Sequence, residues 1–167
     1  FMATLEILHY PDERLKLKAK NVVEFNSSLE QIIADMAETM YQFNGIGLAA
    51  IQVNIQKRIF ITDLAKDGEP SKLVAYINPK IINTQGQKTG DEGCLSVPGI
   101  FEPVTRAEVI TLEYQDTKGT KHSVTCEGLQ AVCLQHELDH LDGKVFVEYL
   151  SNLKQNFIKK KMKKLFK

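Results

Sequence analysis

His136, Glu137 and His140 form the motif HExxH within the run QHELDHLDG. On a helix, residues four positions apart lie on one face, so both imidazoles can reach a single metal ion. Glu137 follows His136 directly, and its carboxylate can hold a water molecule at that ion and move its protons. The motif therefore indicates metal-assisted hydrolysis, and the rest of the chain must supply a third ligand and a cleft.

The residues around the motif also follow helical spacing. Leu129, Val132, Cys133, His136 and His140 recur at i, i+3, i+4, i+7 and i+11, which predicts one buried face of a helix. Two buried imidazoles need either hydrogen-bond partners or a metal. The alternative is an accidental match in which both histidines are satisfied as core side chains.

The spacing of residues in the sequence does not determine the third metal ligand. A catalytic site needs three protein ligands and one free position, and the candidates are the three cysteines and several carboxylates. Cys133 lies one turn before the motif, too close to wrap round the ion, and Cys126 has nothing distinctive around it. Cys94 stands in a turn-rich stretch where Gly93 permits close approach of the backbone. A small buried hydrophobe is the alternative role for Cys94.

A second segment rich in small residues runs from Gly45 to Gln52. Gly45, Gly47 and Ala50 match a loose dinucleotide-binding pattern, but they follow a helix and precede a strand, which is the wrong context. We expect instead that the backbone runs close to a ligand here, with Gln52 offering a neutral amide. The alternative is a tight connection with Gln52 exposed.

The elements that must hold these residues can be predicted from periodicity. A helix begins at Ser27, with Ser27 and Glu30 in capping-box spacing, and ends at Asn44 and Gly45. A second helix is expected from about Glu127 to Gly143. A third is expected from about Leu153, with Leu153, Phe157, Ile158, Met162 and Leu165 on its apolar side. Short strands are predicted at 58–62, 73–77, 109–114 and 121–125, and one more at 144–149. The expected fold class is α+β, with short antiparallel strands packed around a central HExxH helix and a C-terminal helix.

Composition is that of an ordinary soluble enzyme. Residues 1–167 are long enough for one catalytic domain with a real core, and Met2 is the expected natural start. Lys+Arg and Asp+Glu both count 21, so no overall charge favours DNA or a membrane. Three cysteines make a disulfide framework improbable, and we find neither a signal peptide nor a membrane span. A cytoplasmic location is expected.

Three segments, GIGLAAIQ, EGCLS and QHELDHLDG, occur in this order, and together they resemble the motifs of the peptide deformylase family. The resemblance covers nearly the whole chain. The C-terminal helix and the compact length are similar to those of the bacterial type found in Gram-negative organisms. It implies removal of the formyl group from N-formylmethionine on new polypeptides, with release of formate. It also implies Cys94, His136 and His140 as metal ligands and Glu137 as general acid/base. The ion is then expected to be Fe²⁺, and Zn²⁺, Ni²⁺ or Co²⁺ can substitute, because a thiolate with two imidazoles suits all four.

The resemblance also implies how the substrate is held. Gln52 and the Leu95 backbone N–H would bind the formyl oxygen, and the backbone around Gly45 and Gly47 would help to hold the substrate. We expect the methionine side chain in an apolar pocket, and its expected wall is Ile46, Leu129, Val132 and Cys133. The loop Gly99–Glu102 lacks the basic residue found in some relatives, so contacts beyond the formylmethionine are not carried over.

Two rival functions compete with this interpretation. An HExxH endopeptidase would need a His or Glu as third ligand; the sequence has no His after His140, and Glu148 follows soon after Gly143. The other rival is a non-catalytic, metal-stabilised module that binds RNA through the C-terminal lysines. Those lysines are more typical of a solvated helix face, although an enzyme acting on nascent chains could use them to contact ribosomal RNA.

Overall fold

The computed structural model describes residues 3–166, and the expected natural start at Met2 falls outside this range. A five-stranded sheet has the strand order β1-β2-β3-β6-β7, with every neighbouring pair antiparallel. Its strands are β1 (Gly47–Ala49), β2 (Ile59–Asp63), β3 (Leu73–Gln85), β6 (Val109–Gln115) and β7 (Lys121–Glu127). A second, two-stranded sheet pairs β4 (Lys88–Cys94) with β5 (Val97–Arg106). The α+β class with antiparallel strands is confirmed.

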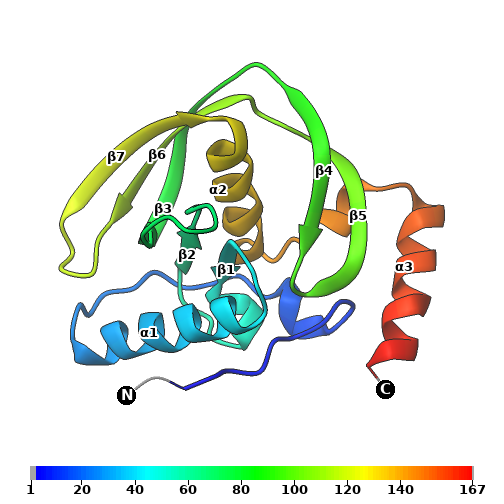
Figure 1. Ribbon diagram of the computed structural model, residues 1–167, viewed down its shortest axis with the longest axis horizontal. Helices are drawn as coiled ribbons and strands as arrows, with labels where there is room; N and C mark the ends of the chain where they lie inside the picture. The colour runs from blue at the N-terminus through cyan, green and yellow to red at the C-terminus, as the bar shows by residue number, and fades with distance from the viewer. Residues whose placement is uncertain (1–2, 167) are drawn as a thin grey trace.

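In residues 3–166, three α-helices surround and fill this arrangement: α1 (Ser27–Gln42), α2 (Gly128–Leu141) and α3 (Asn152–Leu165). Figure 1 shows α2 at the centre, between the larger sheet and the β4–β5 ribbon, while α1 lies below and α3 lies beyond β5. Short 3-10 helices lie at η1 (Glu13–Lys16), η2 (Ala50–Val53) and η3 (Phe146–Tyr149). The HExxH helix is therefore central, as expected. Within residues 3–166, no helix has the length and apolar character needed to span a membrane.

Strand alternation explains how the sheet holds two helices at once. Ile59 and Ile61 of β2 belong to the apolar cluster that contains Met36 and Met40 of α1. Phe60, between them, belongs to the cluster on the other side, with Leu134 and Leu138 of α2. Successive side chains of a strand point to opposite faces, so β2 is buried on both. The fully buried β2 thereby fixes α2 relative to the rest of the fold.

The caps of α1 differ from the sequence prediction at one end. Asn26, not Ser27, is the N-cap, and its side-chain oxygen accepts a hydrogen bond from the Leu29 N–H at 3.2 Å. The Ser27 capping box was therefore wrong by one residue, since Asn is an equally strong N-cap. The C-terminal end is as predicted: Asn44 has φ +57°, and the Gly45 N–H donates to the Met40 carbonyl at 2.9 Å. This turn directs the chain into β1.

Three further differences from the sequence prediction need correction. The strand expected at 144–149 is the 3-10 helix η3, which Glu148 stabilises by accepting a hydrogen bond from the Val145 N–H at 2.7 Å. Strands β4 and β5 were missed, because β4 contains two glycines and exposes most of its side chains. Strand β3 also continues well past the predicted end at Ile77.

The apolar side predicted for α3 is only partly buried. Ile158 and Met162 pack into the core, whereas Leu153, Phe157 and Leu165 are exposed. Periodicity identified the helix correctly but overestimated how much of its face the protein covers. The exposed part of this face remains available for other contacts.

Candidate metal centre and cleft

The two motif histidines lie on the buried face of α2. His136 is 7% exposed and His140 is fully buried, because Ala131, Leu134 and Leu138 anchor the same helix in the core. The HExxH spacing thus brings both rings to one place inside the protein, with ring centroids 5.0 Å apart. This is the arrangement expected from the four-residue spacing.

Cys94 reaches the same place from the other sheet. It is the last residue of β4, where the ribbon turns into β5, and its Sγ lies 3.3 Å from His140 Nε2. One ligand atom from each of Cys94, His136 and His140 lies within 4.8 Å of the others. Bonds from a transition metal to sulfur and nitrogen are about 2.0–2.3 Å, so these donors are close to the spacing of a shared ion. Cys126, by contrast, is part of the core cluster.

Several observations test whether these residues fit a cation. Burial opposes a positive charge on His136, but its contacts with Cys94 and Glu92 outweigh this and raise its pKa well above the usual value. Burial and the charges of His136 and Arg106 lower the pKa of His140 well below the usual value, which leaves its ring neutral. The surroundings of His136 therefore favour a positive charge, and the neutral His140 ring has a nitrogen lone pair that can bind a cation. One thiolate and two imidazoles also suit Fe²⁺, Zn²⁺, Co²⁺ or Ni²⁺, so the donor set fits a metal ion.

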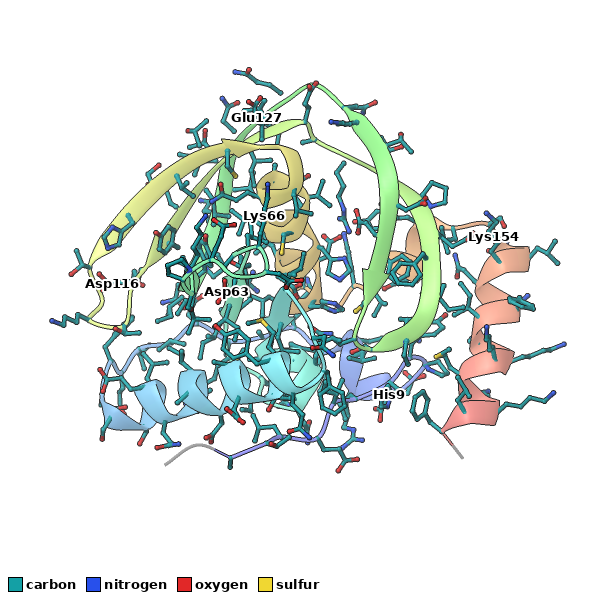
Figure 2. All side chains as sticks on the ribbon, in the orientation of Figure 1. His9, Asp63, Lys66, Asp116, Glu127 and Lys154 are labelled. Atoms are coloured by element: carbon teal, nitrogen blue, oxygen red, sulfur yellow. The ribbon has the colours of Figure 1, made fainter. Side chains whose placement is uncertain are left out.

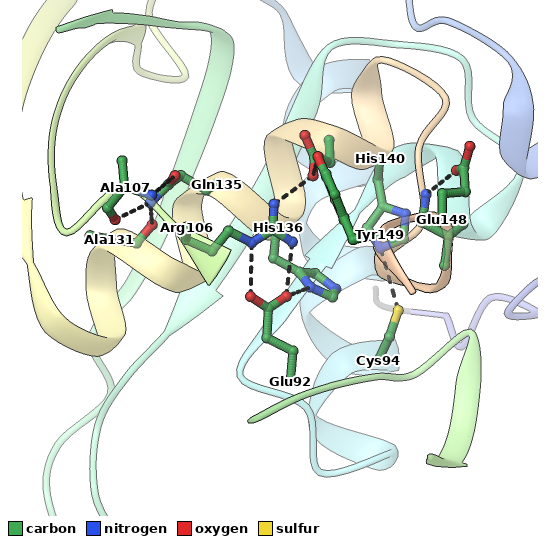
Figure 3. Close-up of polar contacts among 12 residues, drawn as sticks. Glu92, Cys94, Arg106, Ala107, Ala131, Gln135, His136, His140, Glu148 and Tyr149 are labelled. Atoms are coloured by element: carbon green, nitrogen blue, oxygen red, sulfur yellow. Dashed lines mark hydrogen bonds and ion pairs between the residues drawn. The ribbon is translucent and has the colours of Figure 1, made fainter. Parts of the chain in front are cut away.

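A buried ionic network orients His136, and the sequence analysis missed it. His136 Nδ1 lies 2.9 Å from Glu92 Oε1, and both Glu92 oxygens accept hydrogen bonds of 2.8 Å from Arg106 (Figure 3). Arg106 also donates to Asp139 at 2.6 Å, and the Tyr149 hydroxyl donates to the same Asp139 oxygen at 2.8 Å. Although burial raises the pKa of Glu92, its hydrogen bonds with Arg106 and His136 prevail and lower it to about 2. Glu92 is therefore a carboxylate that holds the His136 ring with Nε2 toward the centre.

The Glu92→Gln substitution is expected to weaken metal binding by about 10–100-fold, as is typical when a residue that supports a metal ligand is lost. It removes the charge that holds both His136 and Arg106, while keeping the size of the side chain. Chelator competition on the purified protein measures the effect. Glu113→Gln, on the exposed side of β6, is the matched control. An unchanged metal affinity in Glu92→Gln contradicts the orienting role.

Glu137 points into the centre and lacks a partner for one oxygen. It is 4% exposed, and among residues 3–166 no group hydrogen-bonds to its Oε1. Burial raises the pKa of Glu137 to about 7, against the charges of His136 and Arg106. A Cβ atom on Gly47 would lie 2.5 Å from Glu137 Oε2, so the absence of a side chain at Gly47 makes room for this carboxylate. A buried carboxyl with such a pKa can both accept and return a proton near neutral pH.

Gln52 is also at the centre, and the alternative that it is exposed is wrong. Its side chain is buried, and its Oε1 accepts a hydrogen bond from the Ala49 N–H at 2.9 Å. Because that N–H can only donate, the Gln52 amide nitrogen must face the other way. It lies 3.0 Å from Ser96 Oγ and 3.4 Å from Cys94 Sγ. Gln52 therefore presents an N–H donor beside the thiol.

A cleft of about 440 Å³ opens onto this centre. Its wall includes most of the residues predicted from sequence: Gly45, Ile46, Gly47, Gln52, Cys94, Leu95, His136 and Glu137. Leu95 also packs against Gly45, where an added Cβ would lie 2.6 Å from a Leu95 methyl carbon. The segments GIGLAAIQ and EGCLS thus contact each other and line one cleft.

The four residues expected around the methionine side chain line a smaller hollow of about 130 Å³ beside His136 and Glu137. They are Ile46, Leu129, Val132 and Cys133. Cys133 is buried, but Leu129 is 60% exposed, so Leu129 does not belong to the buried face predicted for this helix. It lies one turn before Cys133 on α2 and forms an exposed part of the hollow's lining. Glu92, His136 and Glu137 complete its lining, so the hollow is apolar in part and borders one of the predicted metal ligands.

Comparisons with known proteins agree with this geometry. The family model described as polypeptide deformylase matches residues 4–156. The peptide deformylase of Nitrosococcus oceani is 51% identical over 163 residues, which cover 98% of this chain and 96% of that protein. That of Neisseria meningitidis serogroup B is 52% identical over the same coverage. Among solved structures, the peptide deformylase of Legionella pneumophila has a TM-score of 0.91 and 44% identity, covering 98% of this chain and 95% of that one. The Ehrlichia chaffeensis peptide deformylase in complex with actinonin has a TM-score of 0.94 and 39% identity, covering 99% of both chains.

Proposed function

This chain belongs to the peptide deformylase family, and we propose from this premise that Cys94, His136 and His140 are its metal ligands and Glu137 its acid/base residue. The enzyme is a metal-dependent hydrolase. It removes the formyl group from the N-terminal N-formylmethionine of newly synthesised polypeptides and releases formate. We further propose that residues 1–167 act as one catalytic domain and that the enzyme works in the cytoplasm.

One observation carries the assignment of the site. The sulfur of Cys94 and a ring nitrogen of each motif histidine converge within 4.8 Å at the base of the cleft that Glu137 and Gln52 also line. These residues come from three separate segments of the sequence. Their convergence supports a single reaction centre over an accidental HExxH match.

The protein's own residues divide the work of amide hydrolysis between them. A bound divalent cation supplies Lewis acidity, which makes water more acidic and polarises a carbonyl. The free Oε1 of Glu137 takes a proton from the attacking water and later delivers it to the departing amine nitrogen. The Gln52 amide and the Leu95 backbone N–H donate hydrogen bonds to the formyl oxygen as it gains negative charge. Loss of one such donor typically costs about 2.7–4 kcal/mol of transition-state stabilisation.

We propose that the methionine side chain occupies the smaller hollow. Ile46, Leu129, Val132 and Cys133 supply its apolar contacts, and the backbone at Gly45 and Gly47 runs along the substrate. The hollow opens directly beside His136 and Glu137, so a side chain seated there holds the N-terminal formyl group next to the reaction centre. Binding of this kind positions the reacting atoms and lowers the entropic cost of reaction.

Formate release tests the activity directly. The anaerobically purified protein is incubated with formyl-Met-Ala and, separately, with an internally quenched peptide that reports endopeptidase cleavage. We expect formate from the first and no cleavage of the second. Cleavage of the quenched peptide without formate release favours the rival endopeptidase. Against that rival, the Glu148 carboxylate already accepts a hydrogen bond within η3.

We propose Fe²⁺ as the native ion, with Zn²⁺, Ni²⁺ or Co²⁺ able to replace it. Ferrous iron beside a thiolate is sensitive to oxygen, whereas nickel and cobalt keep their oxidation state in air. The iron-loaded protein is therefore expected to lose activity in air much faster than the nickel-loaded protein. Both forms are followed by formate release at fixed times. Equal rates of decay contradict iron as the native ion.

We also propose that α3 contacts the ribosome while the enzyme acts on nascent chains. Lys160, Lys161, Lys163 and Lys164 are exposed on α3, and lysines in such a cluster attract nucleic-acid phosphates. The triple substitution Lys160→Glu, Lys161→Glu and Lys164→Glu is expected to reduce co-sedimentation with ribosomes. It keeps Ile158 and Met162, whose packing a truncation would remove.

The matched control for this experiment reverses charges elsewhere on the surface. Lys118→Glu with Lys121→Glu changes the exposed β6–β7 hairpin and is expected to sediment with ribosomes like the unmodified protein. Activity on formyl-Met-Ala is expected to be the same in all three proteins. Equal ribosome binding by the α3 variant defeats the proposal.

A further inference from the structure

A second hollow, of about 320 Å³, lies between β5 and α3. Two phenylalanines form its exposed edges: Phe101 of β5 is 69% exposed and Phe157 of α3 is 64% exposed. Buried Ile158 lies behind them. Large aromatic side chains with this exposure on facing elements are unusual unless something covers them.

This hollow adjoins the catalytic cleft. Gly99 and Phe101 line both of them. The Phe101 ring also covers Gly93, the residue before Cys94, because a Cβ atom on Gly93 would lie 2.5 Å from a ring carbon. The Phe101 ring therefore contacts the wall of the catalytic cleft at Gly93 and also forms part of the hollow beside α3.

The charges around the hollow are already neutralised. Lys154 Nζ lies 2.7 Å from Glu102 Oε1, and Figure 2 shows Lys154 at the end of α3 that faces β5. This pair leaves no free charge from either residue to select a charged ligand. What the hollow offers is the two phenylalanine rings and Ile158, so its chemistry suits a large apolar side chain.

We propose that this hollow binds a large apolar side chain of the substrate polypeptide, several residues after the formylmethionine. The inference rests on the proposed seating of the formyl group beside Glu137. A polypeptide held there must leave the cleft, and an extended chain advances about 3.3 Å per residue. Phe101 lines the cleft, and it also lines the hollow together with Phe157. A side chain tethered to the bound N-terminus also reaches the hollow at high effective concentration.

Peptides with one leucine in an alanine background test the proposal. Formyl-Met peptides carry the leucine at each position from the third to the seventh, and their kcat/KM values are divided by that of the all-alanine peptide. In the unmodified enzyme we expect this ratio to rise about 3–10-fold at one or two positions, mainly through KM, as partial burial of one leucine permits. In Phe157→Ser the ratio is expected to fall to about one at every position. Leu165→Ser, an exposed leucine on the same helix outside the hollow, is expected to keep the rise.

Three results would overturn the proposal. The first is a ratio of one at all positions in the unmodified enzyme, and the second is an equal loss in Leu165→Ser. The third is a dimer in solution that Phe157→Ser dissociates, which would make a second copy of this chain the occupant. Failure of the proposed function has a separate signature, since then even formyl-Met-Ala would release no formate.

Discussion

The Glu137→Ala variant is expected to keep its metal and to lose nearly all turnover. Glu137 is buried, has an oxygen without a partner among residues 3–166, and has a pKa raised to about 7. These are the properties of a group that exchanges protons with a substrate. Positioned acid/base groups contribute about 10²–10⁴-fold to rate, so kcat for formyl-Met-Ala should fall by that factor. Metal analysis after dialysis should give the same content as in the unmodified enzyme.

A control separates lost chemistry from lost structure. Glu137→Gln keeps the volume beside Gly47 but cannot accept a proton, so it should be as inactive as the alanine variant. Both variants should unfold at a temperature close to that of the unmodified enzyme. Ordinary activity in either variant removes Glu137 from the mechanism.

Cys94→Ser is expected to lose most of its metal. The hydroxyl of serine is a far poorer ligand for a soft or borderline ion than a thiolate. Loss of a residue that merely supports a ligand costs about 10–100-fold in affinity, and loss of the sulfur itself should cost more. The measurement is metal content after dialysis against a weak chelator, together with formate release.

Cys126→Ser is the matched control, because Cys126 is a free thiol in the apolar core and is not one of the predicted metal ligands. It should retain full metal content. The opposite pattern, with metal kept in Cys94→Ser and lost in Cys126→Ser, eliminates Cys94 as a ligand. Equal loss in both variants would indicate that general destabilisation, not ligation, is measured.

Local periodicity explains why much of this site could be predicted. The four-residue spacing of His136 and His140 determines their common face whatever the helix packs against. The same holds for α1 and α3, whose apolar repeats predict the helices, and for the β6–β7 hairpin, whose turn at Asp116–Gly119 is visible in the sequence. The resemblance of three short segments to a known family then predicted that Cys94 and Gln52 belong to the same site.

Contacts between distant segments explain what was missed. Arg106 lies fourteen positions from Glu92, on the other strand of a hairpin that the sequence did not reveal, and the pair bonds at 2.8 Å. Glu92 did carry a signal, since it stands two residues before Cys94 and regular strand alternation would put both on one face, although the register is irregular between them. Without strand β4, that signal could not be interpreted.

Burial was the other quantity that periodicity could not supply. Leu129 continues the repeat of α2, yet it is exposed in the lining of a hollow. Phe157 continues the repeat of α3, yet only Ile158 and Met162 are covered. A repeat identifies one side of a helix, whereas the neighbouring elements decide how much of that side is buried. Two of the residues where the two differ, Leu129 and Phe157, line the smaller hollows.

X-ray absorption spectroscopy of the anaerobically metal-loaded protein tests the central claim most directly. That claim is that Cys94, His136 and His140 share one ion. The account predicts one sulfur and two imidazole nitrogens around the metal in the unmodified enzyme, with the sulfur signal absent from Cys94→Ser. A metal environment of nitrogen and oxygen alone in the unmodified enzyme would contradict it.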